Sequence, residues 1–137
     1  MPLFYADTSA LAKLVVEAPE SEALRMFVTA ADLVSSELVL TELPRAIRRA
    51  AARDPRLPAD VLMERTDELL DSIALCPLDR ALLLAAGALV EPALRALDAI
   101  HVATAVDVLP HDGFVSYDER QNAAARLAGL RTFAPRG

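Results

Sequence analysis

Four acidic residues are the best candidates for catalytic or metal-binding side chains in this chain, because each lies next to apolar residues in the sequence. Asp7 and Asp118 directly follow short, mostly apolar runs, whereas Glu42 and Asp98 lie within helical patterns rich in leucine and alanine. A carboxylate is expensive to remove from water, so each of the four requires a compensating partner. Carboxylate oxygens are the ligands that hard divalent cations prefer in proteins. The four acids therefore predict a carboxylate cage for a divalent cation.

The elements that would position these acids alternate along the chain, with short apolar runs between longer helical patterns. Strands are predicted at residues 3–6, 33–35, 73–75, 113–116 and 131–133. Helices are predicted at residues 10–16, 21–30, 36–52, 58–70, 79–89, 96–108 and 119–127. This alternation is typical of an α/β fold with a parallel sheet covered by helices on both faces. A chain of 137 residues is expected to form one domain, over residues 1–137.

The two acids at strand ends have a functional and a structural interpretation. The carboxyl edge of the sheet is where open α/β folds bind ligands, so Asp7 is expected at a binding site. Alternatively, Asp7 caps the following helix, although Thr8 and Ser9 offer the same cap. Asp118 likewise either joins Asp7 in the site or caps the last helix.

The two acids within helices are open to the same question. Asp98 lies on an apolar side of its helix, so it contributes either to the site or to a buried ion pair with Arg95, three residues earlier. Glu42 lies at the boundary between an apolar stripe and a row of arginines. If it is an ordinary surface residue, it pairs with Arg45 or Arg49.

A row of four arginines follows Glu42 on the polar side of the same predicted helix: Arg45, Arg48, Arg49 and Arg53. Charge runs of this kind are usually solvated helix faces. The functional alternative is a rail of positive charge that contacts phosphates beside the acidic site. His101, three residues after Asp98, is expected to be a packed core residue rather than a general base.

Composition restricts the classes of protein to which the chain can belong. The net charge of −6 argues against nucleic-acid binding by bulk electrostatics, although bound divalent cations would offset part of it. No apolar stretch approaches the ~18 residues of a membrane span, and no signal peptide is expected. Cys76, the only cysteine, is expected at a buried strand end and excludes an internal disulfide. These features predict a cytoplasmic protein without a membrane segment.

Four motifs occur in a fixed order and together resemble one family. They are Asp-Thr-Ser-Ala at residues 7–10, Thr-Glu-Leu at 41–43, Leu-Asp-Ala-Ile-His-Val-Ala-Thr-Ala at 97–105 and Ser-Tyr-Asp-Glu-Arg at 116–120. This set resembles the PIN-domain ribonucleases, and most closely the VapC toxins of bacterial VapBC toxin–antitoxin pairs. The resemblance implies a single PIN domain, a three-layer α/β/α sandwich with a central parallel β-sheet.

The resemblance also implies a site and a reaction. Asp7, Glu42, Asp98 and Asp118 would be the catalytic residues and would bind Mg²⁺ or Mn²⁺, which activates water for attack on the scissile phosphate. The substrate would be RNA, and the products would carry a 5′-phosphate and a 3′-hydroxyl. Further contacts to substrate or water are expected from Thr8, Ser9, Arg95 and Ser116.

The family also implies partners: a VapB-like antitoxin, a second copy of the chain in a homodimer, and operator DNA reached only through the antitoxin. One alternative is a PIN-domain nuclease that processes RNA or cleaves DNA outside such a pair. The other is a non-catalytic PIN-like binding module. A phosphotransferase of the aspartyl-phosphate type is disfavoured. It would normally need a second acid where Ser9 stands and a late lysine, whereas Lys13 is the only lysine.

Overall fold

The computed structural model describes residues 1–137 and contains five strands and seven helices. The strands are β1 (Leu3–Ala6), β2 (Asp32–Ser36), β3 (Ala74–Cys76), β4 (Gly113–Val115) and β5 (Thr132–Phe133). The helices are α1 (Thr8–Val15), α2 (Ser21–Val28), α3 (Val39–Arg53), α4 (Ala59–Ser72), α5 (Arg80–Gly87), α6 (Ala96–Asp107) and α7 (Glu119–Leu127). All strand pairs are parallel, which confirms the predicted α/β class.

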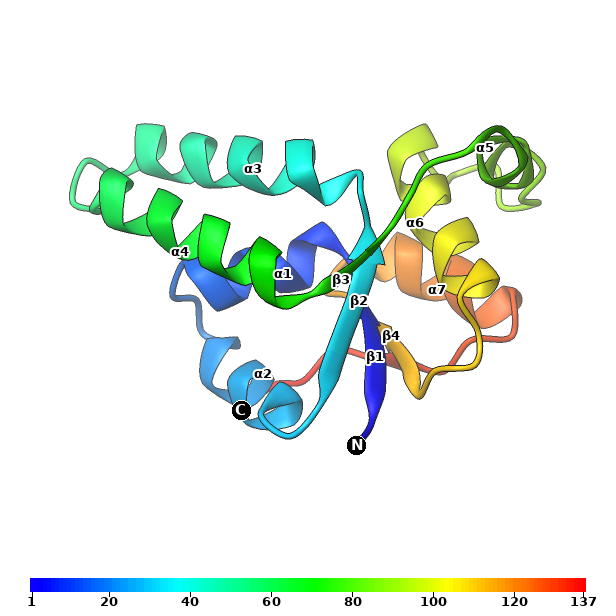
Figure 1. The fold of residues 1–137 in the computed structure, drawn as a ribbon, viewed down its shortest axis with the longest axis horizontal. Helices are drawn as coiled ribbons and strands as arrows, with labels where there is room; N and C mark the ends of the chain where they lie inside the picture. The colour runs from blue at the N-terminus through cyan, green and yellow to red at the C-terminus, as the bar shows by residue number, and fades with distance from the viewer.

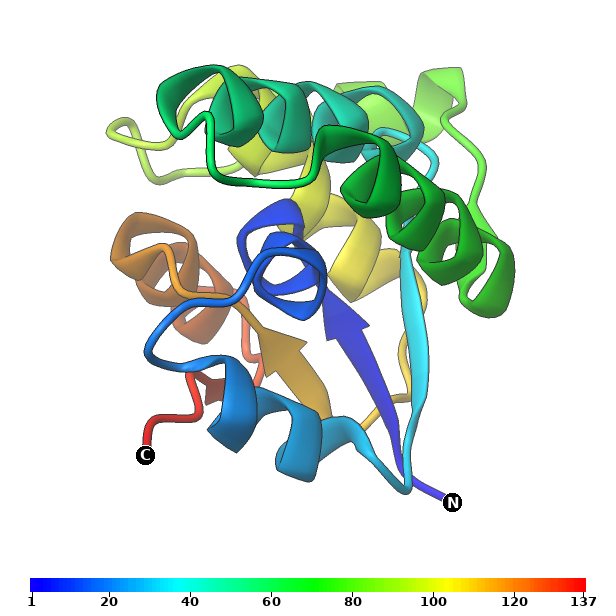
Figure 2. The ribbon, with the colours of Figure 1, turned by 90° about the vertical axis from the view of Figure 1, so that its left-hand side faces the viewer.

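The sheet separates two helical layers (Figures 1 and 2). Helices α1 to α4 cover one face, and α5 to α7 cover the other. The side chains of β1 alternate accordingly. Phe4 and Ala6 belong to the core beneath the first layer, and Tyr5 belongs to the core beneath the second. The structure is therefore the three-layer sandwich that the sequence predicted.

Strand order explains where a ligand site is expected. The order is β3-β2-β1-β4-β5, so the chain builds outward from β1 in one direction and then crosses to its other side to form β4. Tyr5 pairs with Val34 of β2 and with Phe114 of β4. In sheets of this kind the crevice for a ligand lies where the direction of building reverses, outside the carboxyl ends of the strands. Here that place is between β1 and β4.

Two predicted helix starts are wrong. Helix α1 begins at Thr8 and is capped by Asp7, whose carboxylate accepts from the amide of Ala10. The predicted start at residue 10 assigned the cap to Thr8 or Ser9, but their hydroxyls have other partners. Helix α3 begins at Val39, after a turn, because Ser36 still belongs to β2 and pairs with β3. No helix has the length and apolar character to cross a membrane.

Candidate active site

The four acids are all located where a helix begins. Asp7 and Asp118 are the N-caps of α1 and α7, and Glu42 and Asp98 lie in the first turns of α3 and α6. The first turn of a helix carries partial positive charge, which favours a carboxylate or a bound phosphate there. Four helices from both layers therefore direct their positive ends toward the carboxyl edge of the sheet.

Asp7 is fully buried and held by two serine hydroxyls. Ser9 Oγ donates to Oδ1 over 2.7 Å, and Ser116 Oγ donates to Oδ2 over 2.6 Å. Because Ser9 follows β1 and Ser116 follows β4, the two hydroxyls bridge the crevice at the switch in strand order. Burial raises the pKa of Asp7, and the nearby His101 and the two hydroxyls oppose that rise only in part. The carboxyl group is thus fixed in orientation but costly to ionise.

Glu42 contacts the opposite helical layer instead of the arginines of its own helix. Its Oε1 accepts from Thr8 Oγ1 over 2.7 Å and lies 2.7 Å from His101 Nε2. Half-burial raises the pKa of Glu42, but the hydrogen bonds from His101 and Thr8 and the charge of Arg49 outweigh that effect and leave the pKa below its usual value. The predicted pairing with Arg45 or Arg49 is therefore wrong, and Glu42 is ionised at neutral pH.

His101 is buried and bonded through both ring nitrogens. Its Nδ1 lies 2.8 Å from the hydroxyl of Tyr5, and its Nε2 faces Glu42. Burial raises the pKa of the Tyr5 phenol far above its ordinary value, so that hydroxyl keeps its proton. The network assigns the Tyr5 O–H as donor to Nδ1 and the Nε2–H as donor to Glu42. His101 is a packed residue, as predicted, and it also orients a carboxylate of the site.

Asp98 lies beside the other three acids. Burial raises its pKa, and the charges of Asp118, Glu42 and Asp7 raise it further. Gln121 Nε2 of α7 donates to its Oδ1 over 3.1 Å. The predicted ion pair with Arg95 is absent, because Arg95 precedes α6 with an exposed side chain that makes no ion pair.

Asp118 caps α7 through the amides of Arg120 and Gln121, so the predicted capping role is confirmed. The same carboxylate raises the pKa of Asp98 and therefore also faces the acidic cluster. We use the term acidic cluster for Asp7, Glu42, Asp98 and Asp118. Its members come from four separate elements, and each has at least one hydrogen-bond donor of its own.

The chemistry of the acidic cluster fits a hard divalent cation, since its donors are carboxylate oxygens whose charges repel one another. This repulsion adds to the larger effect of burial in raising the pKa of Asp98. No three acidic, histidine or cysteine side chains converge closely enough in this structure to enclose an ion. The carboxylates therefore lie near one another and accept hydrogen bonds from protein groups. A bound ion would have to compete with those hydrogen-bond donors for the carboxylate oxygens.

Comparison with known proteins connects this site to a family. The family model described as PIN domain matches residues 4–127, which include all four acids. The chain belongs to the PIN-domain family. Two relatives of this PIN domain from Mycobacterium tuberculosis are named Ribonuclease VapC47, 34% identical with 97% of each chain covered, and Ribonuclease VapC46, 37% identical with 98% of this chain and 99% of the relative covered.

A third relative of the PIN domain, Ribonuclease VapC35 from Mycobacterium tuberculosis, is 36% identical over 97% of both chains. Among solved structures, the crystal structure of PAE2754 from Pyrobaculum aerophilum matches with a TM-score of 0.63 at 18% identity. That match covers 91% of this chain and 81% of the other, and it supports the fold alone.

Three residues that complete the site in this PIN domain were not predicted as part of it: Tyr5, His101 and Gln121. Each contacts the acidic cluster or its supporting residues across a long separation in sequence. For Tyr5 and His101 the only signal was a polar group in an otherwise apolar segment, whereas Gln121 lies among other polar residues and gave no signal. Buried polar groups are nearly always hydrogen-bonded, so such residues are worth testing as partners of nearby acids.

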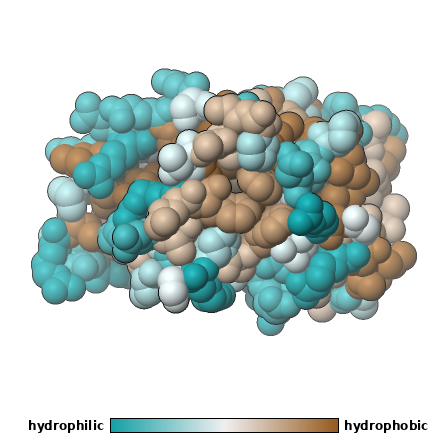
Figure 3. Space-filling view, turned by 90° about the horizontal axis from the view of Figure 1, so that it is seen from below, coloured by the Kyte–Doolittle hydropathy of each residue, from teal (hydrophilic) through white to brown (hydrophobic).

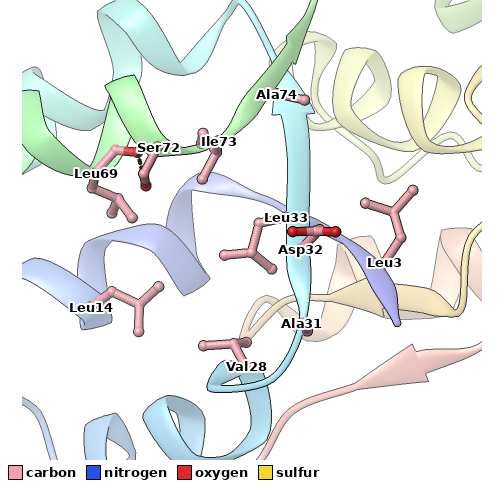
Figure 4. A pocket seen from close by; sticks show the side chains of 10 residues that line it. All are labelled: Leu3, Leu14, Val28, Ala31, Asp32, Leu33, Leu69, Ser72, Ile73 and Ala74. Atoms are coloured by element: carbon pink, nitrogen blue, oxygen red, sulfur yellow. Dashed lines mark hydrogen bonds between the residues drawn. The ribbon is translucent and has the colours of Figure 1, made fainter. Parts of the chain in front are cut away.

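The largest cavity of the PIN domain lies away from the acidic cluster. It has a volume of about 540 Å³ and is mostly apolar, with Leu14 of α1, Leu33 of β2 and Leu69 of α4 among its lining residues (Figure 4). It lies toward the amino ends of β1 and β2, whereas the acids lie at the carboxyl ends. Seen from below, hydrophobic side chains gather across the middle and at the right-hand edge of the molecule, and hydrophilic groups gather at the left-hand end and along the lower edge (Figure 3).

Proposed function

We propose that this PIN domain is a Mg²⁺- or Mn²⁺-dependent endoribonuclease and the toxin of a type II toxin–antitoxin pair. The observation that carries the proposal is the acidic cluster, whose members lie at the helix ends around the switch between β1 and β4. The full-length relatives named Ribonuclease VapC support RNA as the substrate.

In this proposal the acidic cluster would hold the cation, which when bound would supply a Lewis acid for the scissile phosphate and would lower the pKa of a water molecule so that it loses a proton before attack. The protein supplies the orientation of the carboxylates. Ser9 and Ser116 hold Asp7, and Thr8 with His101 holds Glu42. Positioned ligands need no rearrangement during the reaction, which lowers its barrier.

We propose further substrate contacts from the residues around the acidic cluster. The hydroxyls of Thr8, Ser9 and Ser116 already orient carboxylates of the acidic cluster, and in this proposal they also order water or phosphate beside them. The exposed guanidinium of Arg95 stands at the start of α6, where it is free to contact a phosphate.

Cleavage of RNA by the purified protein tests the proposed reaction. We expect Mg²⁺ or Mn²⁺ to be required, excess chelator to stop cleavage, and the products to carry a 5′-phosphate and a 3′-hydroxyl. Cleavage that persists in chelator, or that leaves a 2′,3′-cyclic phosphate, would show that a different mechanism operates. Absence of cleavage with either metal would favour a non-catalytic PIN-like module.

The toxin role requires a protein partner that neutralises the activity. We propose a VapB-like antitoxin whose apolar segment covers an exposed apolar part of this chain, and the 540 Å³ cavity is a candidate for that contact. Expression of the chain should stop growth, and co-expression of the small gene beside it should restore growth. If that product neither co-purifies nor inhibits cleavage, a nuclease outside a toxin–antitoxin pair becomes the better assignment.

We also propose a homodimer, with operator DNA contacted through the antitoxin and not through this acidic chain. Exposed leucines of α5, Leu83 and Leu84, offer apolar surface for a second copy. Light scattering of the isolated protein tests the dimer, and a strictly monomeric chain would contradict it. A cytoplasmic location is proposed because the substrate is RNA and Cys76 has no disulfide partner within the chain.

A further inference from the structure

A second polar cavity borders the acidic cluster on the side of α3. Its volume is about 260 Å³, and only one of its six lining residues is hydrophobic. The lining residues are Thr8, Thr41, Glu42, Arg45, Arg49 and Leu97. Glu42 belongs both to this cavity and to the acidic cluster, so the two spaces share a wall. An extended ligand such as a polynucleotide could therefore continue from the acidic cluster into this cavity.

Helix geometry places the charged residues of the cavity in one row. Glu42, Arg45 and Arg49 follow one another at intervals of three and four residues, which lie on the same face of a helix. Arg45 and Arg49 are separated by about 6 Å along the axis of α3, at about 1.5 Å per residue. The two positive side chains thus follow one another along one face of α3, leading away from the acidic cluster.

Neither arginine has a direct protein partner, although the charge of Arg49 helps to lower the pKa of Glu42. The six ion pairs of the structure involve neither Arg45 nor Arg49, and neither side chain makes a hydrogen bond. Arg25, Arg56 and Arg126, in contrast, are each paired with a carboxylate. The guanidinium groups of Arg45 and Arg49 are therefore available to an anion that binds in the cavity beside the acidic cluster.

The remaining lining groups suit a nucleotide. Thr41 presents an exposed hydroxyl that makes no hydrogen bond in the protein, and Leu97 of α6 presents an exposed apolar surface. Guanidinium groups bind phosphate through two parallel hydrogen bonds, and an apolar side chain can pack against a sugar or a base. The cavity therefore combines contacts for both parts of a nucleotide.

We propose that this cavity is a subsite for the RNA backbone, in which Arg45 and Arg49 bind phosphates next to the one that is cleaved. The proposal rests on the proposed ribonuclease function and adds to it the side on which the strand leaves the acidic cluster. In this proposal two of the four arginines on α3, Arg45 and Arg49, bind the substrate. Arg48 instead borders a cavity between α3 and α4, with Met63.

Steady-state cleavage of a single-stranded RNA tests the subsite. Arg45→Gln/Arg49→Gln should raise KM at least 10-fold and change kcat by less than 2-fold, since the arginines bind substrate without touching the reacting atoms. Each phosphate contact to a single strand contributes about 0.7 to the slope of log affinity against log salt. The slope of log kcat/KM should therefore fall by about 1.4.

The matched control is Arg65→Gln/Arg80→Gln, which removes the same charge from exposed sites on α4 and α5 that do not line the cavity. It should leave KM within 2-fold of the wild type. Arg45→Lys/Arg49→Lys keeps the charge and should keep most of the salt dependence. Equal effects of the two glutamine pairs, or an unchanged KM, would refute the subsite while wild-type cleavage upholds the nuclease. A wild type that cleaves no RNA would refute both.

Discussion

The imidazole Nε2 of His101 lies 2.7 Å from Oε1 of Glu42 and thereby joins α6 to α3. The two helices cover opposite faces of the sheet (Figure 1). The other ring nitrogen is bonded to Tyr5 of β1, so one buried histidine connects the sheet and both helical layers beside the acidic cluster. We infer that it sets the position of Glu42 relative to the other acids.

Replacement of His101 should reduce activity more than its effect on stability alone would explain. His101→Leu leaves the buried Tyr5 hydroxyl without this partner, at a cost of about 1–3 kcal/mol, and leaves Glu42 with Thr8 as its hydrogen-bond donor. Removing a residue that orients a ligand of the metal typically costs about 10–100-fold in metal affinity or activity. Thermal unfolding and the dependence of cleavage on Mg²⁺ concentration measure the two effects separately.

The controls for this substitution are His101→Gln and His111→Asn. Glutamine can still donate to Glu42 and should recover part of the activity. His111 binds the Ala105 carbonyl and the Gly113 amide away from the acidic cluster, so its loss should lower stability but not the response to metal. If His101→Leu and His111→Asn behave alike, His101 has only a structural role.

Asp98 should destabilise the metal-free protein more strongly as the pH rises. Its pKa is raised in the folded state by burial and by Asp118, Glu42 and Asp7. The protonated side chain of Asp98 makes its full contribution to the free energy of unfolding below the pKa of about 3.9 that it has in the unfolded chain. Because the pKa is higher in the folded protein, that contribution is lost as the pH rises through the folded-state pKa. Asp98→Asn should therefore equal the wild type in stability at pH values below about 3.9 and exceed it at pH 7.

Denaturant unfolding in chelator at several pH values measures this difference. The asparagine carbonyl can still accept from Gln121, so the hydrogen bond of Asp98 is retained. Asp67→Asn, at an exposed position of α4, removes the same charge and should show no comparable gain. A stability difference for Asp98→Asn that does not grow with pH would mean that its carboxylate is not repelled by its neighbours.

Divalent cations should stabilise the folded protein, because they relieve the repulsion within the acidic cluster. A ligand present at about 100 times its dissociation constant adds about 2.7 kcal/mol to the free energy of unfolding. Millimolar Mg²⁺ or Mn²⁺ should thus raise the Tm of the wild type, and Asp98→Asn should weaken that effect. If neither metal changes the Tm, the acidic cluster does not bind a cation.

The position of the acids at the sheet edge follows from the sequence alone. Asp7 and Asp118 each come after an apolar run, and strands that alternate with helices form a parallel sheet whose carboxyl ends share one edge. The hydrogen-bond partners of the acids cannot be predicted from the sequence in the same way. Whether Glu42 faces Arg45 or His101 depends on how α3 is placed across the sheet, and no local pattern specifies that.

The error at the start of α1 has a related cause. Asp7, Thr8 and Ser9 are all good helix caps by type, so the sequence does not choose among them. In the folded protein the hydroxyl of Thr8 is used by Glu42 and that of Ser9 by Asp7 itself. Tertiary contacts from α3 and β4 thus decide which residue caps the helix.

Gly113 should tolerate no side chain, because the ring of Phe133 occupies the space beside it. A Cβ atom at this position would meet Cδ2 of Phe133 at 2.7 Å and the Arg131 carbonyl at 3.3 Å. Gly113→Ala should cost about 1–3 kcal/mol by overpacking. Gly87→Ala, where nothing lies within 4 Å, should be neutral or slightly stabilising. Thermal scans that show equal Tm values for the two variants would contradict the packing of β4 on β5.

The most direct test of the proposed function is the rate of RNA cleavage by Asp7→Asn beside the wild type. Asparagine has nearly the same shape, but it removes the charge that a cation would need, at the position held by Ser9 and Ser116. We predict that cleavage falls at least 100-fold while circular dichroism and thermal unfolding show an intact fold. A folded Asp7→Asn protein that cleaves RNA at the wild-type rate would contradict catalysis by the acidic cluster.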